Sequence, residues 1–216
     1  MSDLTVAQFA ERLAVVHQRI EAAGGSLQTT SVLAVSKTFP AAAANVALAA
    51  GAVDLGENYG QELEAKAPEV PGARWHFIGG LQRNKVKRIA GVVAVWHTVD
   101  RSELANEIAK RAPGTSVFVQ VNTTGEAQKS GCEPAGTAAM VEHCRHLGLD
   151  VRGLMTIGPT DGSHPGASFA QLRALGEASE TLELSMGMSA DLEAAVAEGS
   201  TMVRVGSALF GARLRF

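Results

Sequence analysis

The sequence is poor in the residues that would tie it to several common classes of protein. Among its 216 residues are two cysteines, two tryptophans and one tyrosine, and aromatic residues make up 5% of the chain. The two cysteines, Cys132 and Cys144, cannot form a disulfide framework, and their spacing matches no zinc motif. We therefore expect both thiols to be reduced, as in a cytoplasmic protein.

Neither a strong excess of charge nor a long apolar run is present. Lys and Arg total 19 against 22 Asp and Glu, and the net charge of −3 argues against a bulk-basic nucleic-acid binder. The longest apolar run, residues 41–53, is interrupted by Asn45 and is shorter than the ~20 residues of a membrane span. Residues 1–16 carry Asp3 and Glu11 and lack the features of a signal peptide. The sequence thus predicts a soluble cytoplasmic protein that binds neither nucleic acid nor membrane.

What the chain does contain is a recurring unit of a short apolar run, a turn and an amphipathic helix. Eight such runs read as strands that are buried on both faces: residues 32–35, 53–55, 75–78, 92–97, 116–121, 151–155, 182–185 and 202–205. Helical patterns lie between them, for example 102–111, with Ser102 as the expected N-cap, and 138–147, closed by Gly148.

Strands that alternate with helices predict a parallel sheet with right-handed crossovers. Eight strands in 216 residues leave about 27 residues per unit, which is compact for a (β/α)8 TIM barrel of about 200–250 residues. A doubly wound open sheet is the alternative, but it usually has five or six strands, and no G-x-G-x-x-G follows the first strand. The pattern favours one α/β domain, a single (β/α)8 barrel over residues 1–216.

The carboxyl ends of barrel strands carry the active site in this fold, and Lys37 follows the first predicted strand. An amine held among apolar walls loses solvation of its charged form and becomes a better nucleophile toward carbonyls. A lysine that simply reaches solvent from a strand end is the ordinary alternative.

The loops after the seventh and eighth predicted strands resemble the recurring phosphate site of these barrels. Gly187 and Gly206 allow close approach of the backbone to an anion, and Ser189 and Ser207 offer hydroxyls. Together with the lysine, they suggest a phosphorylated carbonyl ligand bound as a Schiff base. Pyridoxal phosphate fits this description, and so does the substrate of an aldolase.

Seven blocks are spread along the chain: AVSKT (34–38), GENYGQ (56–61), WHFIGGLQRNK (75–85), HTVDR (97–101), GLMTIGP (153–159), LSMGMSAD (184–191) and VRVGSALFG (203–211). In these blocks the sequence resembles the YggS/PROSC-type family of pyridoxal phosphate homeostasis proteins. The resemblance implies a fold-type III barrel like the N-terminal domain of alanine racemase, without a C-terminal β-domain.

The resemblance also implies a set of cofactor-binding residues. By the family's pattern, Lys37 carries pyridoxal 5'-phosphate as an internal aldimine and Arg204 faces the pyridine nitrogen. The phosphate is then held by Ser189, Gly206 and Ser207, with Ser185 as a second choice. The pocket is lined by Asn58 and Met155, with His76 as a weaker candidate.

The predicted function is that of a carrier rather than an enzyme. A guanidinium can only donate, so it leaves the ring nitrogen unprotonated and a poorer electron sink. Racemisation needs a second acid or base on the opposite face, and the single tyrosine, Tyr59, is expected to be a packing or edge residue. We expect a monomeric carrier that buffers the vitamin B6 aldehyde and supplies it to apo-enzymes. A minimal pyridoxal-phosphate-dependent racemase or decarboxylase and a cofactor-free aldolase are the open alternatives.

Three other features have ordinary interpretations. His143 and His146 lie three residues apart without an obvious carboxylate, which is more typical of surface histidines than of a metal site. The basic run 83–88 is more typical of a solvated helix face. Lys129 follows the fifth predicted strand, as an exposed loop lysine or as a second lysine near the ligand.

Overall fold

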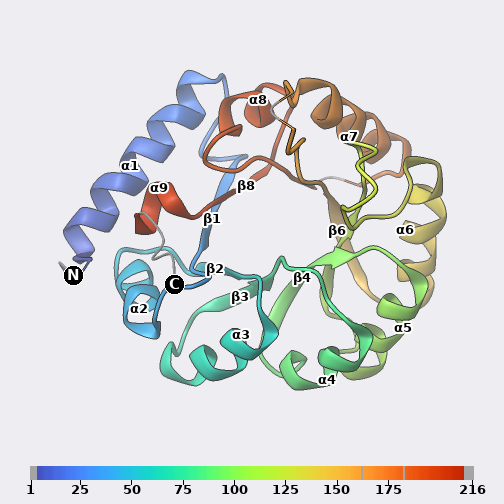
Figure 1. The fold of residues 1–216 in the computed structure, drawn as a ribbon, viewed down its shortest axis with the longest axis horizontal. Helices are drawn as coiled ribbons and strands as arrows, with labels where there is room; N and C mark the ends of the chain where they lie inside the picture. Colours follow the sequence, from blue (N-terminus) through green and yellow to red (C-terminus); the bar gives the residue numbers. More distant parts are fainter. Residues whose placement is uncertain (1–3, 162, 182, 212–216) are drawn as a thin grey trace.

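The computed structural model describes residues 4–161, 163–181 and 183–211. Within these residues, eight parallel strands close into a barrel in chain order (Figure 1). They are β1 (Ser31–Val35), β2 (Asp54–Glu57), β3 (Arg74–Phe77), β4 (Val93–Val99), β5 (Ser116–Gln120), β6 (Asp150–Met155), β7 (Glu183–Ser185) and β8 (Met202–Val205). The predicted (β/α)8 barrel is confirmed. The open sheet is excluded because β1 and β8 are paired neighbours.

The helices form a ring outside the barrel, as Figure 1 shows. They are α1 (Val6–Ala22), α2 (Ala41–Ala49), α3 (Gly60–Lys66), α4 (Val86–Ile89), α5 (Ser102–Arg111), α6 (Thr137–His146), α7 (Gly166–Ala178), α8 (Leu192–Ala197) and α9 (Ser207–Phe210), with short 3-10 turns η1 (Ala67–Glu69), η2 (Arg83–Lys85) and η3 (Pro134–Gly136). A capping box of Thr5 and Gln8 starts α1, which packs against α2, α8 and α9. Among the described residues, no helix combines the length and the apolar character that crossing a membrane requires.

The predicted elements agree with the observed ones to within two residues, and β8 matches its prediction at both ends. Leu182, the first residue of the seventh predicted strand, lies outside the described residues. The prediction of Ser102 as an N-cap is wrong. Arg101 has extended backbone angles and its carbonyl accepts from the Ala105 N–H, so Arg101 is the N-cap and Ser102 is the first helical residue. Gly148 follows α6 with a left-handed φ of 74°, as its role in closing that helix requires.

The two faces of the strands carry different residues. In β1, Ala34 packs in the main core between strands and helices, whereas Leu33 and Val35 form a separate cluster with Met202 and Ile78. The same alternation turns other residues into the barrel interior, and these include polar ones, all almost fully buried: His76, His97, Ser185 and Arg204. A barrel interior is usually filled by branched apolar side chains. These four buried polar side chains are therefore unusual for a barrel interior, and they indicate that it supports a functional site.

Candidate functional site

Lys37 lies two residues beyond the end of β1 and is half-buried. The Ser36 N–H donates to the Gly56 carbonyl at 3.0 Å, which continues the contact of β1 with β2 up to the residue before the lysine. Thr38, the residue after it, has a φ of 68°, in the left-handed region that β-branched residues rarely occupy. Such a conformation persists only where surrounding contacts impose it.

A buried charge cluster supplies those contacts. Glu57 Oε1 accepts from Ser36 Oγ at 2.7 Å and from Lys66 Nζ at 2.5 Å. Lys66 Nζ also donates to Glu62 Oε1 at 2.9 Å, and the same Glu62 oxygen accepts from the Thr38 N–H at 2.7 Å. Burial raises the pKa of Glu57, and the Lys66 ammonium opposes this rise. Both neighbours of the candidate nucleophile are therefore tied to β2 and α3.

Arg204 is buried inside the barrel at β8. Its Nη1 donates to the Ser185 carbonyl at 2.6 Å and to Ser185 Oγ at 2.9 Å, and its Nη2 donates to the Thr156 carbonyl at 2.7 Å. Burial lowers the pKa of Arg204 to about 10, so the group still carries its charge at neutral pH. A guanidinium has five N–H donors. Among the described residues, the Nε proton and one Nη2 proton have no partner, so both remain for a ligand.

Two glycine-containing turns follow β7 and β8. Gly187 has a φ of 91°, and a Cβ there would lie 2.5 Å from the Ala195 Cβ, so this turn requires glycine. Its carbonyl accepts from the Arg204 N–H at 2.9 Å, which joins the turn after β7 to strand β8. A Cβ on Gly206 would lie 3.3 Å from the Val35 carbonyl oxygen, close to the strand that carries Lys37.

The structure separates the two serines that sequence left as alternatives for the phosphate. Ser185 is fully buried, and its hydroxyl lies 3.0 Å from His97 Nδ1 and 2.9 Å from Arg204 Nη1, inside the barrel. Ser189 is half-buried in the turn beyond β7, and its carbonyl accepts from Arg19 of α1 at 2.9 Å. Ser207 is exposed and begins α9. Ser189 and Ser207 therefore stay the predicted phosphate ligands.

Asn58 and Met155 have different surroundings. Asn58 Oδ1 is buried without a hydrogen-bond partner among the described residues. Asn58 also lines a cavity of about 220 Å³, together with Tyr59, Gln82, Lys85, Arg88 and others. Met155 is fully buried against Val95 and Phe118, and in the barrel it pairs with Ser185. Tyr59 is exposed at the start of α3, as expected of an edge residue.

Strand pairing brings the predicted residues to one end of the barrel. Leu33 of β1 pairs with Arg204 of β8, and Val35 pairs with Gly56 of β2. The turns after β1, β2 and β8 are thus neighbours, and they carry Lys37, Asn58, Gly206 and Ser207. The bonds of Arg204 to Ser185 and Thr156 link this group to β7 and to the end of β6.

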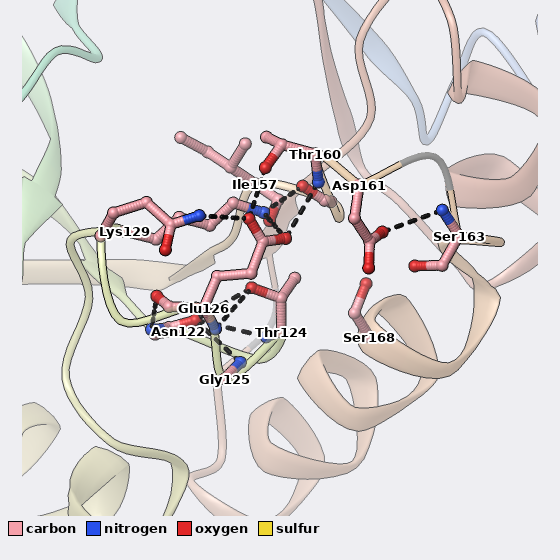
Figure 2. A network of polar contacts seen from close by, with 12 residues as sticks. Asn122, Thr124, Gly125, Glu126, Lys129, Ile157, Thr160, Asp161, Ser163 and Ser168 are labelled. Carbon is pink, nitrogen blue, oxygen red and sulfur yellow. Dashed lines mark hydrogen bonds and ion pairs between the residues drawn. The ribbon is translucent and has the colours of Figure 1, made fainter.

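Lys129 belongs to a neighbouring network, which Figure 2 shows. Its Nζ pairs with Glu126 at 2.9 Å and donates to the Gly158 carbonyl at 2.5 Å, and its side chain is 11% exposed. Glu126 Oε1 also accepts from the Thr160 N–H at 2.9 Å. Lys129 therefore joins the loop after β5 to the loop after β6, and the expectation of an exposed lysine is wrong.

Sequence reasoning missed His97, Glu57 and Lys66. His97 opens the HTVDR block and Glu57 lies within GENYGQ, so both stood in recognised segments, but neither follows its strand as Lys37 does. His143 bonds to Asn106 at 3.0 Å on the outside of the barrel. Across the described residues, no cluster of His, Cys, Asp and Glu could hold a metal ion. The thiols of Cys132 and Cys144 are free, and burial raises the pKa of Cys144 to about 12.

The site thus combines a lysine, a buried arginine and two glycine-containing turns at one end of a parallel barrel. Comparison with known proteins shows which family has this arrangement. Residues 6–214 match the family described as alanine racemase, N-terminal domain. Two relatives are named pyridoxal phosphate homeostasis protein. The one from Pseudomonas aeruginosa is 47% identical over 94% of this chain and 95% of its own, and the one from Escherichia coli K12 is 40% identical over 94% and 96%.

Among solved structures, PipY of Synechococcus elongatus PCC7942 with PLP bound has a TM-score of 0.82 and 35% sequence identity to this chain. The match covers 94% of this chain and 100% of that one. This chain belongs to the alanine racemase N-terminal domain family and, within it, to the family of pyridoxal phosphate homeostasis proteins. The resemblance seen in the sequence blocks is confirmed.

Proposed function

We propose that this protein binds pyridoxal phosphate reversibly at the mouth of its barrel, limits the free aldehyde and supplies the cofactor to apo-enzymes. The observation that carries the proposal is the pairing of β1 with β8, since Lys37 follows β1, Arg204 lies in β8 and Gly206 follows β8. When bound, pyridoxal phosphate supplies an aldehyde carbon, an aromatic ring nitrogen and a phosphate. Each of these groups has a chemically matching residue at this mouth.

The residues present fit the group. The Lys37 amine suits the aldehyde, and the remaining Arg204 N–H groups suit a ring nitrogen that accepts a hydrogen bond. The turns at Gly187 and Gly206, with Ser189 and Ser207, suit the phosphate. The buried and unpartnered Asn58 Oδ1 leaves an acceptor for a ligand hydroxyl or amine. Met155 contributes an apolar wall below them.

We propose a carrier without strong catalysis of its own. Arg204 is charged at neutral pH, and it donates to the ring nitrogen rather than protonating it, which weakens electron withdrawal from a bound amino acid. Racemisation also needs acid and base groups on both faces. The one tyrosine, Tyr59, is exposed at the start of α3 and lines the neighbouring cavity.

We also propose that residues 1–216 act as one cofactor-binding domain, as a cytoplasmic monomer. Closure of a single barrel by β1 and β8 supports the first statement, because the core is complete within one chain. Light scattering at two protein concentrations, with and without pyridoxal phosphate, tests the second. A mass of two chains under either condition would contradict it.

The decisive experiment loads the protein with pyridoxal phosphate, reduces it with borohydride and maps the modified peptide by mass spectrometry. We expect the label on Lys37 and no label in Lys37→Ala, with Lys129→Ala as the control that keeps it. Label on another residue, or undiminished label in Lys37→Ala, would overturn the proposal. Exchange of the α-hydrogen of amino acids in heavy water tests the carrier role, and robust exchange that depends on Lys37 would make the protein an enzyme.

A further inference from the structure

A continuous line of polar side chains crosses the barrel interior and ends at Arg204. Asp54 Oδ1 lies 3.0 Å from His76 Nε2, and His76 Nδ1 lies 2.9 Å from His97 Nε2. His97 Nδ1 lies 3.0 Å from Ser185 Oγ, which accepts from Arg204 Nη1 at 2.9 Å. The five residues come from β2, β3, β4, β7 and β8. We call them the interior relay.

The relay is enclosed by apolar groups. The His97 ring stacks on Phe118 with centroids 4.4 Å apart and an interplanar angle of 17°. Burial lowers the pKa of His97 well below its ordinary value of 6.5, with smaller contributions from His76 and Arg204. His97 is therefore neutral at pH 7, with one ring nitrogen that donates and one that accepts.

The two charged ends of the relay, the Arg204 guanidinium and the Asp54 carboxylate, together set the direction of its bonds. Arg204 donates to Ser185 Oγ, and among the described residues the acceptor within reach of the Ser185 hydroxyl proton is Nδ1 of the neutral His97. His97 then carries its proton on Nε2 and donates to His76 Nδ1. His76 in turn donates from Nε2 to the Asp54 carboxylate. Each donor meets an acceptor, and the two ends carry opposite charges.

Asp54, at the end of the relay opposite Arg204, has hydrogen bonds from two residues. Asp54 opens β2 and also accepts from Arg74, which opens the neighbouring strand β3. Burial raises the pKa of Asp54, but the hydrogen bonds from His76 and Arg74 lower it by more, so the pKa is well below its ordinary value. The carboxylate is charged at neutral pH and can only accept. Because Asp54 only accepts, His76 must donate to it, and the donors of the relay all point from Arg204 toward Asp54.

We infer that His97 and Ser185 are positioning residues for Arg204, held in register by the interior relay that is anchored on Asp54. The relay fixes one edge of the guanidinium inside the barrel and leaves the Nε proton and one Nη2 proton for a ring nitrogen at the mouth. This inference rests on the proposed function for the identity of the ligand. The tautomer of His97 does not depend on the identity of the ligand, so it can be measured in the protein without ligand.

The first test uses the unmodified protein without ligand. Protein labelled with 15N-histidine is expected to show, at pH 7, His97 as a neutral imidazole that is protonated on Nε2. A cationic His97, or His97 protonated on Nδ1, would overturn the directed relay. This outcome does not depend on whether pyridoxal phosphate binds.

The second test measures the ring nitrogen of bound 15N-labelled pyridoxal phosphate in Ser185→Ala, Ser185→Thr and the surface control His143→Gln. We expect Ser185→Ala to move the 15N shift and to weaken binding about tenfold, as for loss of a hydrogen bond to a charged group. Ser185→Thr, which keeps the hydroxyl, restores the shift, and His143→Gln leaves it unchanged. An unchanged shift in Ser185→Ala overturns the positioning role and leaves the proposed function standing. Absence of binding by the unmodified protein overturns the proposed function instead.

Discussion

Lys66 Nζ lies 2.5 Å from Glu57 Oε1, and the two side chains are 4% and 0% exposed. The pair sits below the turn that carries Lys37, because Lys66 also donates to the Ser36 carbonyl at 3.0 Å. A buried ion pair is weak evidence of net stabilisation, since desolvation of both charges offsets their attraction. Its role here is to position the backbone: Lys66 and Glu57 both hydrogen-bond to Ser36, the residue before Lys37.

Removal of one partner of this pair is expected to be costly. Lys66→Met leaves the Glu57 carboxylate buried without its ammonium, and we expect the free energy of unfolding to fall by about 3–5 kcal/mol in urea titrations. Lys87→Met, at an exposed position of α4, serves as the control and is expected to stay within about 0.5 kcal/mol.

The double variant Glu57→Gln with Lys66→Met separates charge from packing. Without the buried carboxylate, much of the lost stability returns, because no uncompensated charge remains. If Lys66→Met alone unfolds like the parent protein, the charge cluster does not hold the Lys37 turn.

Gly206→Ala tests the turn after β8. Its backbone tolerates alanine, but the new Cβ would press on the Val35 carbonyl at 3.3 Å. We expect pyridoxal phosphate to bind about tenfold more weakly, or about 1.4 kcal/mol, in a spectrophotometric titration. Gly136→Ala, where a Cβ meets nothing within 4 Å, is the matched control. Equal affinity in both variants would separate the Gly206 turn from the ligand.

The pH dependence of stability tests the neutral state of His97. As pH falls below about 6.5, the unfolded chain protonates this histidine while the folded chain does not, because burial lowers its folded pKa. Stability contributed by His97 is therefore complete above pH 6.5 and is lost as the pH falls. The expected slope approaches about 1.4 kcal/mol per pH unit for one proton.

Urea titrations between pH 5 and 7 measure that slope. His97→Gln is expected to reduce it, whatever its stability at pH 7. Phe118→Leu removes the ring that stacks on His97 but keeps the imidazole, so it loses stability and retains the slope. Equal slopes in the parent protein and in His97→Gln would contradict a neutral buried imidazole.

Glu126→Ala tests the network of Figure 2. Glu126 accepts from Thr160 and pairs with Lys129, so its loss releases the loop after β5 from the loop after β6. We expect faster amide hydrogen exchange in residues 122–131 and 157–160, with the barrel strands unchanged. Glu133→Ala, at an exposed position nearby, is expected to leave these rates as they are. Unchanged exchange in Glu126→Ala would show that other contacts join the loops.

The strand pattern of the sequence was sufficient for the fold, since eight short apolar runs separated by helices have few ways to pair. It also placed Lys37 and Gly206 correctly at strand ends, because the end of a buried apolar run is visible in the sequence. Ser102 shows the limit of such signals: a good capping residue stands one position inside the helix that Arg101 caps.

Residue order alone therefore determined which side chains reach the mouth of the barrel. Closure of the sheet decided which of them meet inside it. Four strands, β3, β4, β7 and β8, each contribute one of the interior residues His76, His97, Ser185 and Arg204. Their positions in the sequence follow no regular spacing that would predict the contact. They come within hydrogen-bond distance because alternate residues of a closed barrel share one narrow interior, where each buried polar group must find its partner on another strand.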